Sequence, residues 1–467
     1  MTEAHPLQPL FAPRSVAIIG ASSNPTRVSG RILQILKDSG YSGKISPVNP
    51  SHLTVQGISC YASMNDILEP VDLVAIAVPA AAVYEAVANA CQAGARSIAI
   101  FSGGFAETGS EGATRQLQLA ALADVHGVRL LGPNCMGIFN ARENVFVTFA
   151  SVFSSNWVPP GPISIVTQSG AFGAYFYTRA RASGVGLGIG ITTGNEADIT
   201  LADGIAYLAC DTQTRVILVY LEGCRDMSKL SDAIDMARMK DKTIVILKVG
   251  MTPQGRETAM FHTGSPIEDD SLFEELFQRY GVWRVKSMEE MFDVSMMLAN
   301  GPPVTGPRLG IITVSGGVGA LMCDDALRAG LIVPRMEPST YKSLQVELPF
   351  AYVRNPVDVT GAVLSDPTLV DRVLKILAEG GGVDAVIGFF AGMGVSPSSS
   401  VLVQSLIRCT KAYPHIRFIA VMLTSHDVRN ELQEQGIAVF DDPTRAINSL
   451  AAVYECSVLR FNHYSAM

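Results

Sequence analysis

Short apolar runs rich in β-branched residues alternate with segments of helical spacing along this chain, and this alternation limits the possible folds more than any other feature. Residues 15–20 form the first run, which ends in Gly20. Apolar side chains then recur at positions 32, 33, 35 and 36, and Gly40 ends the predicted helix. Strand–helix–strand order places consecutive strands parallel in one sheet, so the sequence predicts an α/β fold. The composition, 48% hydrophobic and 17% charged, fits sheets that are covered on both faces.

The chain is long enough for several domains, because 467 residues correspond to about three units of roughly 150 residues. A Ser/Pro-rich stretch at 151–162 and a Gly/Pro-rich stretch at 300–307 are typical of linkers. We therefore expect domains at 1–150, 151–302 and 303–467. Residues 311–319 and the helix pattern after them repeat the pattern at 165–170, which indicates an internal repeat of the fold.

The turn after the first strand contains a single glycine, Gly20, where dinucleotide-binding folds carry Gly-x-Gly-x-x-Gly. The second strand ends at 47–50 in Pro-Val-Asn-Pro and lacks the acidic residue that binds a ribose hydroxyl. Both features disfavour NAD. The same turn would suit a phosphate-bearing nucleotide, because hydroxyl and amide side chains precede a helix whose N-terminus favours anions. The segments at 77–79 and 101–107 also follow strands, so we expect them at the same edge of the sheet.

Three groups suited to one reaction follow strands of the second predicted sheet. The turn at 168–171 precedes a helix whose N-terminus can hold an anion, and the strand at 215–221 leads to Glu222. The strand at 243–248 leads into a glycine-containing segment, predicted as a loop, that carries His262. A carboxylate can fix the tautomer of an imidazole and raise its nucleophilicity. The set indicates phosphoryl transfer through a phosphohistidine.

Other classes of protein fit the sequence less well. The longest apolar stretches are broken by Pro or Gly, and the N-terminus lacks a basic region followed by an apolar one, so we expect a cytoplasmic protein that does not span a membrane. Eight cysteines without a Cys-x-x-Cys motif indicate neither a zinc site nor a disulfide framework. A net charge of −8 without a basic run disfavours nucleic acid as a partner. The turn at Ser169 lacks the first glycine of a hydrolase nucleophile elbow.

Several short motifs occur in order along nearly the whole chain: Ile-Gly-Ala-Ser at 19–22, Pro-Val-Asn-Pro at 47–50, Gly-Pro-Asn-Cys at 132–135, Thr-Gln-Ser-Gly at 167–170, Gly-Asn at 194–195, Leu-Glu-Gly at 221–223, Lys-x-Gly-x-Thr at 248–252 and His-Thr-Gly at 262–264. As a set, the sequence resembles the NDP-forming acyl-CoA synthetases, specifically the α subunits of ADP-forming acetate–CoA ligases and, more distantly, of succinyl-CoA synthetase. The resemblance implies an N-terminal Rossmann-like CoA-binding domain followed by two flavodoxin-like domains. It also implies interconversion of carboxylic acid, CoA and ATP with acyl-CoA, ADP and phosphate, through acyl phosphate and a phosphohistidine.

The resemblance also assigns site residues. His262 would carry the phosphoryl group and Glu222 would orient it. Phosphate would bind at Ser169, Gly170, Ala171 and Gly264, and no metal ligand is expected on this chain. CoA would bind at Gly20, Ser22, Ser23, Asn24, Asn49, Pro79, Ser102, Gly103 and Gly104. The surroundings of the histidine depart from the family pattern, because Phe261 precedes it and Pro-Ile-Glu-Asp follows at 266–269.

No Gly-x-x-x-x-Gly-Lys-Ser/Thr loop is present, and an ATP-grasp domain would need on the order of 200 further residues. We therefore expect ATP, ADP and Mg to bind on a separate ATP-grasp β subunit, in a hetero-oligomer. The alternative is a CoA-binding or acyl-CoA-binding regulatory protein of the same fold without ligase activity.

Overall fold

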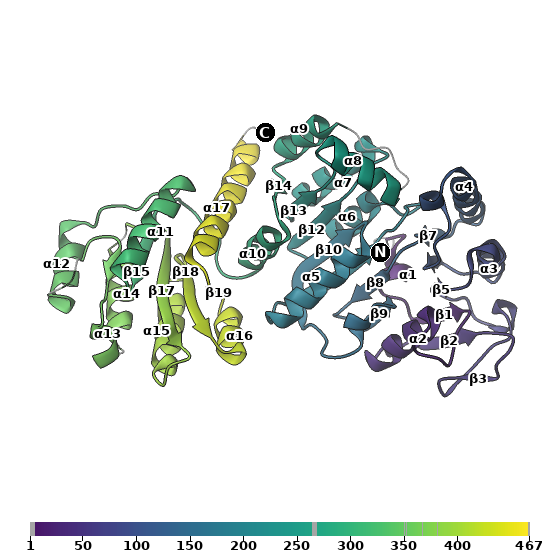
Figure 1. Ribbon diagram of the computed structural model, residues 1–467, viewed down its shortest axis with the longest axis horizontal. Helices are drawn as coiled ribbons and strands as arrows, with labels where there is room; N and C mark the ends of the chain where they lie inside the picture. The colour runs from purple at the N-terminus through teal and green to yellow at the C-terminus, as the bar shows by residue number, and fades with distance from the viewer. Residues whose placement is uncertain are drawn as a thin grey trace. The chain divides into compact units, whose positions relative to one another are not determined.

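The computed structural model describes residues 5–263, 269–349, 351, 353–366, 368–380 and 382–465. These residues form two compact units, Met1–Val285 and Lys286–Met467 (Figure 1). The first unit contains two large sheets and the second unit contains one. In the part of the chain that the structure describes, no helix combines the length and apolar character needed to cross a membrane.

The first large sheet of unit 1 is parallel, with strand order β2-β1-β5-β6-β7. Its strands are β1 (Ser15–Ile19), β2 (Lys44–Val48), β5 (Leu73–Ile76), β6 (Ser97–Ile100) and β7 (Arg129–Leu131). Its helices are α2 (Val28–Asp38), α3 (Ala80–Gln92) and α4 (Ser110–Val125), and the smaller elements nearby are α1 (Gln8–Phe11), β3 (Thr54–Val55), β4 (Ile58–Ser59), η1 (Met64–Asp66) and η2 (Ala106–Thr108). The predicted parallel sheet is confirmed.

The connections of this sheet change direction between β1 and β5. The chain leaves β1 towards β2 on one side, and the next large strand, β5, lies on the other side of β1. In open α/β sheets, ligands bind outside the carboxyl ends of the strands at such a point. The turns after β1 and β5, which begin at Gly20 and Ala77, therefore occupy the favoured position for a ligand.

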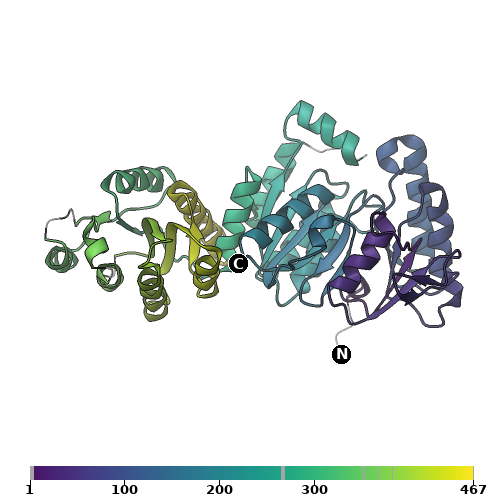
Figure 2. The ribbon, with the colours of Figure 1, turned by 60° about the horizontal axis from the view of Figure 1, so that its bottom comes forward.

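The second large sheet has the order β14-β13-β12-β10-β11-β8-β9. Its strands are β8 (Gly137–Asn140), β9 (Val145–Thr148), β10 (Pro160–Thr167), β11 (Leu187–Thr192), β12 (Val216–Leu221), β13 (Thr243–Lys248) and β14 (Trp283–Arg284). Its helices are α5 (Gly170–Ala182), α6 (Leu201–Cys210), α7 (Met227–Met239), α8 (Pro253–Thr263) and α9 (Asp270–Tyr280), together with η3 (Ser151–Phe153). Helices line both faces of the strands (Figure 2). The connections change direction between β10 and β12, which are parallel neighbours.

Two features of the second sheet differ from the sequence interpretation. The antiparallel hairpin β8–β9 extends this sheet by pairing β8 with β11, although it precedes the Ser/Pro-rich stretch at 151–162. The segment after β13 was expected to be a loop, but Pro253–Thr263 is helix α8. Pro253 is favoured at the start of a helix, and the Thr252 hydroxyl accepts a hydrogen bond from the amide of Gly255 at 3.1 Å. The expectation of a loop over these residues was therefore wrong.

The second unit is a five-stranded parallel sheet of order β16-β15-β17-β18-β19 with helices around it. Its strands are β15 (Leu309–Thr313), β16 (Val357–Asp358), β17 (Ala385–Gly394), β18 (Arg417–Thr424) and β19 (Ala438–Phe440). Its helices are α10 (Met288–Ala299), α11 (Gly316–Arg328), α12 (Pro338–Glu347), α13 (Ala362–Ser365), α14 (Leu369–Glu379), α15 (Ser399–Ala412), α16 (His426–Glu434) and α17 (Pro443–Ser465). Helix α10 packs against α17 within this unit.

Candidate functional site

The turn after β1 packs directly on the turn after β5. Gly20 has φ +85°, and a Cβ atom there would lie 2.8 Å from Val78 Cγ1, so only glycine permits this approach. Ser22, Ser23 and Asn24 follow it as a largely exposed turn, in which the amide of Asn24 donates to the Ser22 hydroxyl at 3.1 Å. The exposed polar groups of this turn are accessible to a ligand at the carboxyl edge of the sheet.

The other candidate CoA-binding residues lie around the same edge. The Asn49 side-chain amide donates to the carbonyl of Ala21 at 2.8 Å, and the Ser102 hydroxyl donates to the carbonyl of Val78 at 2.5 Å. Pro79 immediately precedes α3. Gly103 and Gly104 continue the turn after β6, where the Gly104 amide donates to Glu107 Oε1 at 2.6 Å. The structure thus brings the segments after β1, β2, β5 and β6 together, and the side chains of Asn49 and Ser102 hold these segments to one another.

Helix α5 begins at the carboxyl end of β10. Ser169 is its N-cap and accepts a hydrogen bond from the amide of Phe172 at 3.4 Å, and Gly170 and Ala171 form the first turn. The Thr167 hydroxyl fixes this start, because it accepts from the Ser169 amide at 3.0 Å and donates to the Ser169 carbonyl at 3.0 Å. Amides of the first turn of a helix lack partners within the helix, so this N-terminus favours an anion.

Gln168 joins the start of α5 to the segment after β12. Its side-chain oxygen accepts from the amides of Glu222 at 2.7 Å and Gly223 at 3.1 Å, and its side-chain nitrogen donates to the Gly223 carbonyl at 2.8 Å. Glu222 is buried, with only 4% of the residue exposed. Gln168 and Glu222 follow β10 and β12, the two strands between which the connections of the second sheet change direction. The sequence interpretation did not single out Gln168, although it lies within the Thr-Gln-Ser-Gly motif.

Lys248, the last residue of β13, also contacts the segment at 222–223. Its ammonium donates to the backbone carbonyl of Glu222 at 3.2 Å and also to the carbonyl of Val249, and it lies 4.9 Å from the centre of the Phe273 ring. Burial lowers the pKa of Lys248 to about 8. The Glu222 backbone is thus fixed by Gln168 and Lys248 together.

His262 lies in the last turn of α8, near its C-terminal end. The structure describes the backbone of His262 but not its side chain. Gly264 is not among the described residues. Helix α8 follows β13 along the chain and contacts η2, which comes shortly after the turn at 102–104. The helix that carries His262 is therefore adjacent to the candidate CoA-binding turns.

Asn195 connects the two sheets beside these turns and was not among the predicted site residues. It is 3% exposed, its side-chain nitrogen donates to Glu107 Oε2 at 2.5 Å and to Gln116 Oε1 at 3.1 Å, and its side-chain oxygen accepts from Asn134 at 3.3 Å. Burial would raise the pKa of Glu107, but hydrogen bonds from Gly104, Asn195 and Phe105 outweigh it and lower that pKa. Asn134 has φ 56°, a conformation uncommon outside glycine that is often found at functional sites.

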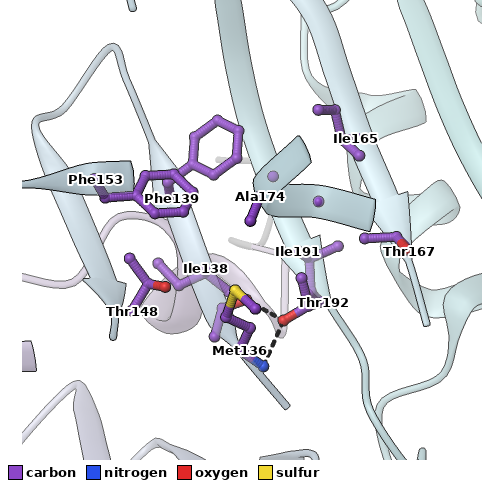
Figure 3. A pocket seen from close by; sticks show the side chains of 13 residues that line it. Met136, Ile138, Phe139, Thr148, Phe153, Ile165, Thr167, Ala174, Ile191 and Thr192 are labelled. Carbon is purple, nitrogen blue, oxygen red and sulfur yellow. Dashed lines mark hydrogen bonds between the residues drawn. The ribbon is translucent and has the colours of Figure 1, made fainter. Parts of the chain in front are cut away.

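A cavity of about 160 Å³ opens between these segments. It is lined by Phe101, Asn134, Cys135, Met136, Phe149, Gln168, Gly170, Gly194 and Asn195. A smaller cavity of about 20 Å³ lies beside α5, and Met136 lines both cavities. Figure 3 shows Met136 with Ile138, Phe139, Phe153, Ile165 and Ile191 around the smaller cavity. The larger cavity touches both the first residue of α5 and Phe101, the residue before the turn at 102–104.

Cys135 is a poor nucleophile at this site. Its thiol donates to the carbonyl of Ile100 at 3.3 Å, and burial raises its pKa to about 12. Among the described residues, no group of three His, Cys, Asp or Glu side chains is placed to hold a metal ion. The polar side chains that line the larger cavity are the amides of Asn134, Gln168 and Asn195, and Asn195 donates to the carboxylate of Glu107.

Comparison with known proteins finds relatives of one family over most of the chain. Residues 14–141 match a CoA binding domain, and residues 160–298 match the succinyl-CoA ligase like flavodoxin domain. The α subunit of ADP-forming acetate–CoA ligase I from Pyrococcus furiosus is 30% identical, over 98% of this chain and 99% of the relative. The α subunit of ligase II from the same organism is 30% identical over 93% and 94%. The dinucleotide forming acetyl-coenzyme A synthetase 1 of Ca. Korarchaeum cryptofilum, solved in complex with phosphate and ADP, matches 99% of both chains with a TM-score of 0.88 and 26% identity.

Proposed function

Because the chain belongs to the family of ADP-forming acetate–CoA ligase α subunits, we propose that it acts as the α subunit of an acyl-CoA synthetase. The reaction interconverts a carboxylic acid, CoA and ATP with acyl-CoA, ADP and phosphate. The residue assignments depend mainly on one observation, the hydrogen bonds that fix the backbone at 222–223. Gln168 holds this segment beside the N-terminus of α5, at the point where the second sheet changes direction.

The proposed site divides the reaction between the two sheets of unit 1. Gly20, Ser22, Ser23, Asn24, Asn49, Pro79, Ser102, Gly103 and Gly104 bind CoA at the edge of the first sheet. The first turn of α5, at Ser169, Gly170 and Ala171, together with Gly264, binds phosphate. His262 carries the phosphoryl group, and Glu222 is the positioning residue that holds the imidazole in the reactive tautomer.

In the direction of synthesis, the carboxylate oxygen of the acid attacks the phosphorus on His262. The N–P bond breaks, and the products are acyl phosphate and free imidazole. The thiolate of CoA then attacks the acyl carbon, a C–S bond forms, and phosphate leaves with the bridging oxygen. Amides at the start of α5 stabilise the charge on the phosphate oxygens in both steps.

The phosphoryl group on His262 comes from ATP bound to a second chain with an ATP-grasp fold, which also binds ADP and Mg. Two relatives of the same length are named as α subunits, and this naming supports a partner subunit. The sequence itself contains no Walker-type loop that would bind the nucleotide.

The test is phosphoenzyme formation from acyl-CoA and labelled phosphate by the purified chain. The label should be acid-labile and base-stable, as expected for phosphohistidine. His262→Ala should abolish the label, and Glu222→Gln should lower its rate of formation by about 10²-fold, as expected for the loss of an orienting carboxylate. His415→Ala, which replaces an exposed histidine in unit 2, is the matched control and should be labelled normally. Label that persists in His262→Ala would contradict the assignment.

A further inference from the structure

A cavity of about 650 Å³ belongs to unit 2, whereas the described residues of the candidate site all belong to unit 1. Helix α12 (Figure 1) forms part of its wall, because the lining positions 338, 341, 342 and 345 share one face of this helix. The complete lining consists of Val333, Pro334, Arg335, Met336, Pro338, Tyr341, Lys342, Gln345, Arg354 and Asn355. Small-molecule pockets have volumes of about 300–1,000 Å³, so this cavity is large enough for such a ligand.

Asn355 fixes the backbone around the cavity. Its side-chain nitrogen donates to the carbonyls of Leu309 at 2.8 Å and Pro334 at 3.2 Å, and its side-chain oxygen accepts from the Ile311 amide at 2.9 Å. These bonds hold the segment before α12 against β15. Tyr341, on α12, packs against the hydrophobic core of unit 2. The cavity is therefore formed by parts of the fold that are held in place without a ligand.

The charged side chains that line the cavity are all positive. They are Arg335, Lys342 and Arg354, and no carboxylate is among the described lining residues. Arg308 in the same unit pairs with Asp384 at 2.7 Å. By contrast, Arg335 and Lys342 form no ion pair with any residue that the structure describes. Guanidinium and ammonium groups bind phosphate oxygens through charge-assisted hydrogen bonds. The cavity therefore suits a ligand that carries phosphate groups.

The remaining lining is mainly apolar and limits the ligand further. Val333, Pro334, Met336 and Pro338 contribute apolar surface beside the ring of Tyr341. Inorganic phosphate or a phosphorylated sugar would leave this surface uncovered, whereas a planar aromatic base can pack on a tyrosine ring. A nucleotide combines such a base with phosphate groups, so it matches both parts of the lining.

We propose that this cavity is a binding site for a nucleoside polyphosphate. The phosphates bind to Arg335, Lys342 and Arg354, and the base packs on Tyr341. Mg²⁺ is usually held by carboxylates together with the phosphates, and the described lining offers no carboxylate. The site therefore binds the nucleotide intact and does not supply the phosphoryl group of the proposed reaction. It is a second ligand site, independent of the residues assigned in unit 1.

The test is calorimetry of the full chain with ATP, tripolyphosphate and adenosine, all without Mg²⁺. We expect ATP to bind at least about tenfold more tightly than tripolyphosphate, and adenosine to bind too weakly to measure, because each fragment contacts only part of the lining. Arg335→Gln combined with Lys342→Gln should weaken ATP binding by about 10²-fold, since each change removes a charged partner of the phosphates. Tyr341→Leu should weaken ATP binding by about tenfold and leave the affinity for tripolyphosphate unchanged.

The matched control combines Lys375→Gln with Lys411→Gln, which removes the same charge from exposed positions of unit 2. This control should bind ATP as the natural chain does. Unchanged ATP affinity in the folded variant of Arg335 and Lys342 would overturn the proposal, because ATP would then bind elsewhere. Equal affinities for ATP and tripolyphosphate would also overturn it, because the cavity would then bind anions without recognising a nucleotide. Neither measurement depends on phosphoenzyme formation.

Discussion

At the scale of single residues, the site depends on side chains that hold the backbone as well as on those expected to react. Glu222 and His262 could be proposed from the sequence, because each follows a strand and carries chemistry that suits phosphoryl transfer. Gln168, Lys248 and Asn195 could not, because their role comes from contacts with residues far along the chain, such as the bonds from Gln168 to residues 222 and 223.

Gln168→Leu should destabilise the segment at 222–223, although Gln168 is not one of the residues proposed to react. The substitution leaves the amides of Glu222 and Gly223 and the Gly223 carbonyl without this partner, and each buried group left unpaired costs about 1–3 kcal/mol. We expect a lower Tm and a slower rate of phosphoenzyme formation. Gln404→Leu, which removes an exposed glutamine that bonds to Glu431, is the control for the loss of a side-chain amide. An unchanged phosphorylation rate in Gln168→Leu would show that the hydrogen bonds from Gln168 to residues 222 and 223 are not needed for phosphorylation.

Lys248 gives a pH dependence of stability. Burial lowers its pKa from 10.5 to about 8 in the folded chain. Below pH 8 the lysine is charged in both states, so its burial penalises the folded state in full. Between pH 8 and 10.5 only the unfolded chain keeps the proton, so the folded state gains stability as pH rises, by about 3 kcal/mol in total.

The comparison that isolates this effect is the Tm of the natural chain minus that of Lys248→Met. We expect this difference to rise between pH 8 and 10.5 and to stay constant from pH 6 to 7. Lys375→Met, which removes a lysine that is 60% exposed, should show no such rise. A constant difference across the whole range would mean that Lys248 keeps its ordinary pKa.

At the scale of helices and strands, local sequence patterns predicted the main strands of the parallel sheets. They did not predict the hairpin β8–β9 or helix α8. The strands β1, β10, β12 and β13 follow from their β-branched runs, and the parallel sheets follow from their alternation with helices. The hairpin β8–β9 was not predicted, because it joins the second sheet by pairing with β11, which lies about 50 residues further on. Helix α8 was missed because the glycines at 250, 255 and 264 favoured a loop, whereas Thr252 and Pro253 start a helix.

The packing of α2 under the turn at 22–24 gives a test of the candidate CoA site. A Cβ atom at Gly30 would lie 2.0 Å from the Asn24 carbonyl oxygen, so Gly30→Ala must displace the backbone of this turn. We expect calorimetry to show CoA affinity reduced by about tenfold or more, and NAD bound more weakly than CoA by the natural chain. Gly361→Ala, at a position with no atom within 4 Å of the added Cβ, should bind CoA normally. Unchanged CoA affinity in folded Gly30→Ala would place CoA elsewhere.

At the scale of the whole molecule, the described residues of the candidate site all belong to one of the two compact units. Unit 1 contains every described residue of the candidate site, on two sheets joined by the contacts of Asn195. Unit 2 repeats the local geometry at the start of α5, because the Thr313 hydroxyl accepts from the Ser315 amide at 3.0 Å, as Thr167 does from Ser169. This similarity agrees with the repeat expected from the sequence, although a repeated turn does not by itself assign a second reaction.

The last prediction concerns the reaction that the purified chain can carry out alone. It should form a phosphoenzyme from acyl-CoA and phosphate, because both candidate sites lie on its own unit 1. It should not form acyl-CoA from acid, CoA and ATP, because the sequence has no Walker-type loop and the described residues offer no cluster of carboxylates or histidines for a metal ion. Addition of an ATP-grasp subunit should start ATP-dependent thioester synthesis, and a mixture with His262→Ala should remain inactive. ATP-driven synthesis by the homogeneous chain alone would show that the nucleotide site lies on this chain and not on a partner.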